Sequence, residues 1–69
     1  MFTVHTTITN KPDTIKDFRK RDDAKAYFYG QMLKYDSLIK QSRNINCEGE
    51  GKNLKLESDH VNIYLEKAK

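Results

Sequence analysis

Few residues in this sequence could carry covalent or metal chemistry. Cys47 is the only cysteine, and His5 and His60 are the only histidines. A cysteine nucleophile needs a histidine base within hydrogen-bond reach, and a zinc site needs local ligand pairs such as Cys-x-x-Cys or two histidines at helical spacing. The three residues form no such local pair, and a catalytic pair would require the fold to bring Cys47 and a histidine into contact. We therefore predict a protein that is not an enzyme and that binds no metal or other cofactor.

The neighbours of these residues indicate structural roles instead. Cys47 alternates with polar residues, so we expect it to point inward from a strand as a small apolar side chain. His5 lies in a row of threonines, and His60 lies in or beside a turn. Gly49 and Gly51 lead into a strand rather than a helix and lack the Lys-Ser/Thr of a phosphate loop, so they indicate a hairpin turn.

An N-terminal hairpin is expected from the first eighteen residues. Apolar or β-branched residues alternate with threonine and histidine from Phe2 to Thr9, which is the period of a strand with one buried face. Residues 10–13 then combine Asn10, Pro12 and Asp13, which favour a turn. Residues 14–18 can return as a second strand.

A single long helix is expected from about residue 21 to residue 40. Asp22 and Asp23 fall in its first turn, where negative charge complements the exposed amide groups and the helix dipole. At 100° per residue, one broad stripe is mainly apolar, and we assign it to the sheet. Its members are Ala24, Tyr27, Phe28, Met32, Tyr35, Leu38 and Ile39.

Two or three strands are expected after the helix, because apolar residues alternate with polar ones around residues 45–47, 54–56 and 61–65. Residues 49–53 predict a hairpin connection, and residues 58–60 predict a tight turn or a bulge. The whole chain, residues 1–69, is therefore predicted to be one α+β domain. One long helix packs on one face of a small antiparallel sheet of about four strands, in the order ββαββ or βαββ.

The best candidate for nucleic-acid binding is a basic cluster at the start of the helix, made of Arg19, Lys20, Arg21 and Lys25. Clustered cations can neutralise phosphates. However, two aspartates follow directly, and the strands lack the aromatic motif that stacks bases in single-strand binders. The simpler interpretation is that these residues form a basic corner exposed to solvent. Weak binding of nucleic acid without sequence preference is the alternative function.

The helix surface opposite the core stripe is less charged than a solvent-facing surface should be. It carries Ala26, Tyr29, Gly30, Leu33 and Ser37. A glycine inside a helix destabilises the helix by about 1 kcal/mol relative to alanine. A glycine is therefore expected at such a position where another chain must approach the backbone closely. Tyr29 and Leu33 lie one turn apart and form an apolar pair beside it. We predict a protein interface here, against the alternative that these are scattered surface residues.

Length and composition limit the remaining possibilities. A chain of 69 residues forms one domain with a small core, and a lone cysteine leaves it without an internal disulfide framework, so oligomerisation is the expected extra support. The sequence has no apolar run long enough to span a membrane, and its start has neither the basic nor the apolar region of a secretory signal. We therefore expect a cytoplasmic, reducing location.

The predicted function is that of a small, non-enzymatic protein-binding module. It would act as a homodimer, or as a regulator or inhibitor of a larger protein, and no small-molecule substrate is evident. The small size and the Lys-, Asn- and Tyr-rich composition fit an accessory protein of a phage or mobile element.

Overall fold

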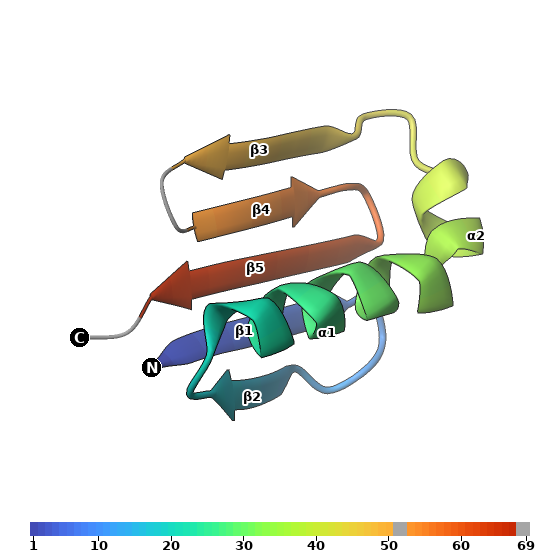
Figure 1. Ribbon diagram of the computed structural model, residues 1–69. Helices are drawn as coiled ribbons and strands as arrows, with labels where there is room; N and C mark the ends of the chain where they lie inside the picture. The colour runs from blue at the N-terminus through green and yellow to red at the C-terminus, as the bar shows by residue number, and fades with distance from the viewer. Residues whose placement is uncertain (51–52, 68–69) are drawn as a thin grey trace.

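The described residues fold into one antiparallel sheet with a long helix across one of its faces and a short helix at one end of the strands (Figure 1). The computed structural model describes residues 1–50 and 53–67. Its elements in chain order are β1 (Phe2–Ile8), β2 (Thr14–Phe18), α1 (Arg21–Lys34), α2 (Asp36–Lys40), β3 (Asn46–Glu50), β4 (Asn53–Glu57) and β5 (Val61–Lys67). The predicted α+β class is confirmed. Within the described residues the sheet has five strands, however, where the sequence predicted about four.

The strands are arranged in the order β2-β1-β5-β4-β3, and every neighbouring pair is antiparallel. The first and last long strands, β1 and β5, therefore lie side by side at the centre. The alternation of β1 places Val4 and Thr6 on the helix side, where both are buried, and Thr3 and His5 on the other side, which is the outer face of the sheet. The predicted N-terminal hairpin is confirmed, and Asn10 adopts the left-handed conformation (φ 66°) in its turn.

The core lies between α1 and the middle of the sheet. α1 packs against β1, β5 and β2, and the predicted orientation of the helix is confirmed because Ala24 and Phe28 are buried. Tyr27, Met32 and Tyr35 pack at the margin of the core. The buried apolar residues are Phe2, Val4, Ile8, Ala24, Phe28, Ile39, Leu56, Val61, Ile63 and Leu65.

The predicted single helix over residues 21–40 is wrong in one respect, because it is broken at Tyr35. This residue has φ −108° and ψ 21°, outside the helical region, and separates α1 from α2. Its backbone amide still donates to the carbonyl of Gln31, which closes the last turn of α1. Its ring is half-buried and packs against the core, with the Lys11 ammonium 5.9 Å from its centroid. The break lets α2 turn away and place Ile39 in the core.

Two predictions about the second half of the chain are also corrected. Of the predicted hairpin connection over residues 49–53, Gly49 and Glu50 belong to β3 and Asn53 belongs to β4, while residues 51 and 52 lie outside the described residues. Cys47 is exposed rather than buried, because α1 does not extend over β3. The Cα partner of Cys47 is the buried Leu56, so both lie on the helix side, but only the β4 residue is covered.

For residues 58–60 the sequence predicted either a tight turn or a bulge, and the structure shows a tight turn that connects β4 to β5. The Ser58 hydroxyl donates to the Val61 carbonyl at 2.6 Å and accepts from the Val61 amide at 3.1 Å. The backbone amide of Asp59 donates to the Ser42 hydroxyl, and the Asp59 carboxylate accepts from the Arg43 amide. These bonds hold the segment after α2 against the β4–β5 turn. Neither α1 nor α2 is long and apolar enough to cross a membrane, and these are the helices of the described residues.

Candidate protein interface

The five residues predicted to form an interface are all exposed. Tyr29 and Leu33 stand out, because 45% of the tyrosine and 78% of the leucine surface is accessible. Both lie on α1 away from Ala24 and Phe28, whose side chains are buried against the sheet. Ala26 and Gly30 lie beside them on the same side of α1 and are also exposed. We call Ala26, Tyr29, Gly30 and Leu33 the α1 stripe.

Ser37, the fifth predicted residue, does not belong to the α1 stripe. It lies on α2, beyond the break at Tyr35, so the helical periodicity that placed it beside Leu33 does not continue to it. It is exposed, and α2 runs at an angle to α1 (Figure 1). The interface predicted from the sequence is therefore shorter than expected, and it is confined to the single helix α1.

Gly30 is not required by any contact inside the chain. A Cβ atom built at this position would meet no heavy atom within 4 Å. The glycine therefore leaves the backbone of α1 uncovered by a side chain at this position, and it lowers the helical propensity at mid-helix. An uncovered backbone would let a second helix approach closely.

The Tyr29 ring contacts one buried ring and lies near one cation. Its ring meets the buried Phe28 ring edge-on, with centroids 5.6 Å apart and planes at 87°. The Lys25 ammonium lies 6.0 Å from the Tyr29 centroid on the exposed side. Exposed tyrosine side chains are common among the residues that anchor protein interfaces.

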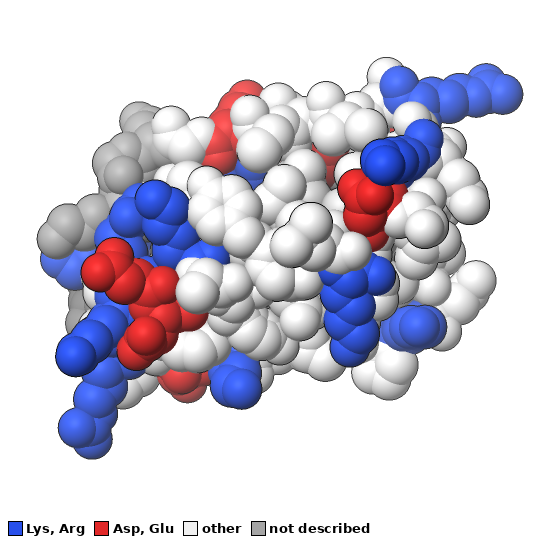
Figure 2. Space-filling model, turned by 45° about the vertical axis from the view of Figure 1, so that its right-hand side comes forward, with Lys and Arg blue, Asp and Glu red and all other residues white. Residues whose placement is uncertain are grey.

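Charges lie around an uncharged area on the helix side of the molecule (Figure 2). The carboxylate of Asp36 and the ammonium of Lys40, both on α2, pair with each other at 2.9 Å. Lys25 interacts with Tyr29, as described above, and Asp22 is exposed in the first turn of α1. An apolar centre with a charged border is the usual anatomy of a protein interface.

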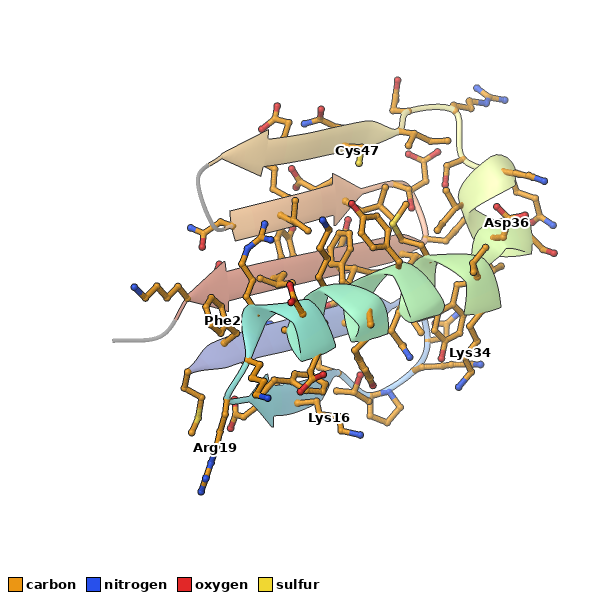
Figure 3. The ribbon with its side chains drawn as sticks, in the orientation of Figure 1. Phe2, Lys16, Arg19, Lys34, Asp36 and Cys47 are labelled. Atoms are coloured by element: carbon orange, nitrogen blue, oxygen red, sulfur yellow. The ribbon has the colours of Figure 1, made fainter. Side chains whose placement is uncertain are left out.

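The structure does not gather the predicted basic cluster into one positive surface. Arg19 extends away from the sheet edge (Figure 3), whereas Arg21 is half-buried, and its Nε atom is buried without a hydrogen-bond partner among the described residues. Lys25 lies over Tyr29, whereas Lys20 is the N-cap residue that precedes the helix. The exposed aspartates of the first turn lie within the same region. This arrangement does not favour nucleic acid as the ligand.

Cys47 and the histidines are not brought together. His5 projects from the outer face of β1, where its Nε2 atom lies 3.5 Å from Asp13. Cys47 lies on the helix side of β3, and two strands separate β3 from β1. His60 is in the β4–β5 turn. Within residues 1–50 and 53–67, no three potential metal ligands form a group.

A charged network on the outer face was not predicted. Lys55 lies 3.0 Å from Glu57 and 3.5 Å from Glu48, and the Tyr64 hydroxyl donates to Glu57 at 3.2 Å. The hydrogen bond with Glu57, followed by the charge of Glu48, raises the pKa of Lys55. Burial, followed by the bond to Glu57, raises the pKa of Tyr64. The Lys-x-Glu spacing in β4 was a signal in the sequence for the Lys55–Glu57 pair. The contacts with Glu48 and Tyr64 could not be predicted, because they depend on strand order.

The carboxyl group of Glu57 should titrate below its usual pKa of 4.5, because it accepts hydrogen bonds from Lys55 and Tyr64. Any stability from this group is present above pH 4.5 and is lost as the pH falls through the lowered pKa. We expect Lys55→Met to move the pKa of Glu57 back toward 4.5, as measured by NMR titration of its side-chain carbon. An unchanged titration would show that Lys55 does not cause the shift.

Comparison of the chain with protein-family models, with curated proteins and with solved structures found no match. The class of the protein is therefore defined by its fold alone, as a small α+β domain with a five-stranded antiparallel sheet and one main helix.

Proposed function

We propose that this chain is a non-enzymatic protein-binding module that binds its partner through the α1 stripe. The observation that carries the proposal is the exposure of Tyr29 and Leu33, side by side, on a helix whose opposite face fills the core. Exposed apolar side chains that cluster mark interaction sites more often than those that lie singly. Gly30 and Ala26 add the room for a close approach.

A second copy of the chain is the first partner to test. A twofold contact needs a surface that is complementary to itself, and the α1 stripe can cross its counterpart with the two Gly30 positions in contact. Small residues at the crossing point would let Tyr29 and Leu33 of each copy cover those of the other. The alternative is a larger protein, which the module would regulate by occupying one of its surfaces.

The proposal predicts that binding and folding respond to different substitutions. Gly30→Leu should block the close approach of a partner while raising helix propensity, and Leu33→Asp should place a charge at the centre of the contact. Both variants should keep the circular dichroism spectrum of the folded protein. We expect each to weaken dimerisation at least about tenfold in analytical ultracentrifugation. A larger partner should be lost from pull-downs to a similar extent.

Ile15→Asp is the matched control, because Ile15 is also an exposed apolar residue, 66% accessible, but lies on the outer face of the edge strand β2. It should leave the association unchanged. If the wild type is monomeric and Gly30→Leu retains every partner captured from the native host, the α1 stripe is ordinary surface and the proposal fails.

A further inference from the structure

We propose a second interaction surface, the free edge of β3, and infer that it binds an extended segment of another protein in which basic and apolar residues alternate. The segment would add to the sheet as a sixth strand. This surface is distinct from the α1 stripe, and its test does not depend on the function proposed above.

The edge of β3 is open to such an addition. β3 is the last strand of the sheet, and its one strand partner among the described residues is β4. From Asn46 to Gly49 every residue is exposed. An edge strand presents unpaired backbone amides and carbonyls, which are a template for another strand.

The opposite edge strand, β2, differs from β3 because a helix covers its helix side. α1 packs against β2, where the rings of Phe18 and Tyr27 lie 5.3 Å apart. α1 makes no comparable contact with β3, and in Figure 1 β3 and β4 lie to one side of the helix and are not crossed by it. Figure 3 shows Cys47 on the helix side of β3, clear of α1. A strand added to β3 would therefore meet no helix on that side.

The two sides of β3 differ in chemistry. On the outer face, Glu48 is exposed and carries a negative charge. On the helix side lie Cys47 and Gly49, next to the half-buried Leu54 of β4, and Ile45 precedes the strand with 51% of its surface accessible. An added strand would therefore need a basic residue on the outer face and apolar residues on the helix side.

β4 already demonstrates this pattern on the paired side of β3. Lys55 lies directly opposite Glu48, with its ammonium 3.5 Å from the carboxylate. Leu54 and Leu56 lie opposite Gly49 and Cys47. The bound segment would thus repeat the Leu-Lys-Leu alternation of β4 on the free side of the strand.

A second copy of β3 is a poor occupant of this edge. In an antiparallel pair centred on Glu48, the two Glu48 carboxylates would face each other on the same side of the sheet. Like charges directly opposite one another destabilise strand pairing, and charged residues protect natural sheet edges in this way. The same carboxylate favours a segment that supplies a cation. We therefore assign the edge to a different protein.

A short peptide tests the proposal directly. The probe is the acetylated and amidated peptide Lys-Leu-Lys-Leu-Thr, which in antiparallel register places lysine opposite Glu48 and leucine opposite Gly49 and Cys47. We expect a Kd on the order of 1 mM, as is typical of a short flexible peptide that is ordered on binding. In ¹⁵N-labelled protein, amide shifts should be largest in β3. The peptide Lys-Lys-Leu-Leu-Thr has the same composition without the alternation, and should bind at least about fivefold more weakly.

Variants of the protein separate this edge from general electrostatic attraction. Glu48→Lys and Glu48→Gln should each weaken binding of the alternating peptide, by about fivefold for the charge reversal. Glu66→Lys is the control, since Glu66 is an exposed acid on the outer face of β5. The affinity of the Glu66→Lys variant for the alternating peptide should not change. The proposal is overturned if both peptides bind equally well, or if the amide shifts are confined to β1 and β5. It is also overturned if Glu66→Lys loses as much affinity as Glu48→Lys, or if no binding is seen at peptide concentrations several times the expected Kd.

Discussion

Replacing Phe28 with alanine is expected to lower the free energy of unfolding by about 3–5 kcal/mol. The side chain is 1% exposed, and it is the largest of the fully buried side chains. Its removal would take apolar surface out of the core and leave a cavity between α1 and the central strands. Natural domains have a total stability of about 5–15 kcal/mol, and a chain this short lies at the low end, so a large part of the population should unfold.

The neighbouring Tyr29→Ala provides the control for this substitution. It also removes an aromatic ring from α1, but Tyr29 is 45% exposed, so the loss of burial is smaller. Urea unfolding followed by circular dichroism should show a much lower midpoint for Phe28→Ala than for Tyr29→Ala. Equal midpoints would mean that the assignment of the core face of α1 is incorrect.

The parts of the fold that the sequence predicts are those set by local periodicity. The alternation from Phe2 to Thr9 is enough to identify β1 and its buried face, because successive side chains of a strand point to opposite sides. The helical spacing of Ala24 and Phe28 identifies the core face of α1 for the same kind of reason. The α1 stripe was predictable because it is the opposite side of that same helix.

The features that were not predictable depend on contacts between distant segments. The break at Tyr35 has no glycine or proline to mark it, and it accompanies the packing of that ring and of Ile39 against the core. Cys47 has the alternation of a buried strand residue, yet it is exposed because α1 covers the centre of the sheet and not β3. The exposure of Cys47 depends on the order of the strands in the sheet, and the sequence alone did not reveal that order.

The proposed edge site on β3 follows from the same non-local information. Glu48 and Lys55 face each other only because β3 pairs with β4 in this register. The sequence identified a hairpin in this region, but it did not show that β3 would be the last strand or that α1 would leave it uncovered. A shift of one residue in register would exchange the two faces of the strand.

Thr6→Val is expected to raise the free energy of unfolding by about 1–3 kcal/mol. Thr6 lies on the helix side of β1 among apolar residues and is 2% exposed, yet its hydroxyl has no hydrogen-bond partner among the described residues. A buried hydroxyl without a partner costs free energy because it has lost its bonds to water. Valine has nearly the same shape and β-branching, so it should fit the site without this penalty.

Thr3→Val on the same strand should have the opposite effect. The Thr3 hydroxyl faces the outer side of the sheet and donates to the Asp17 carboxylate at 2.8 Å, so its loss should lower stability by about 0.5–1 kcal/mol. Thermal and urea unfolding of the two variants should therefore shift in opposite directions from the wild type. A destabilised Thr6→Val would show that the Thr6 hydroxyl is hydrogen-bonded in solution, because only a satisfied hydroxyl makes its removal costly.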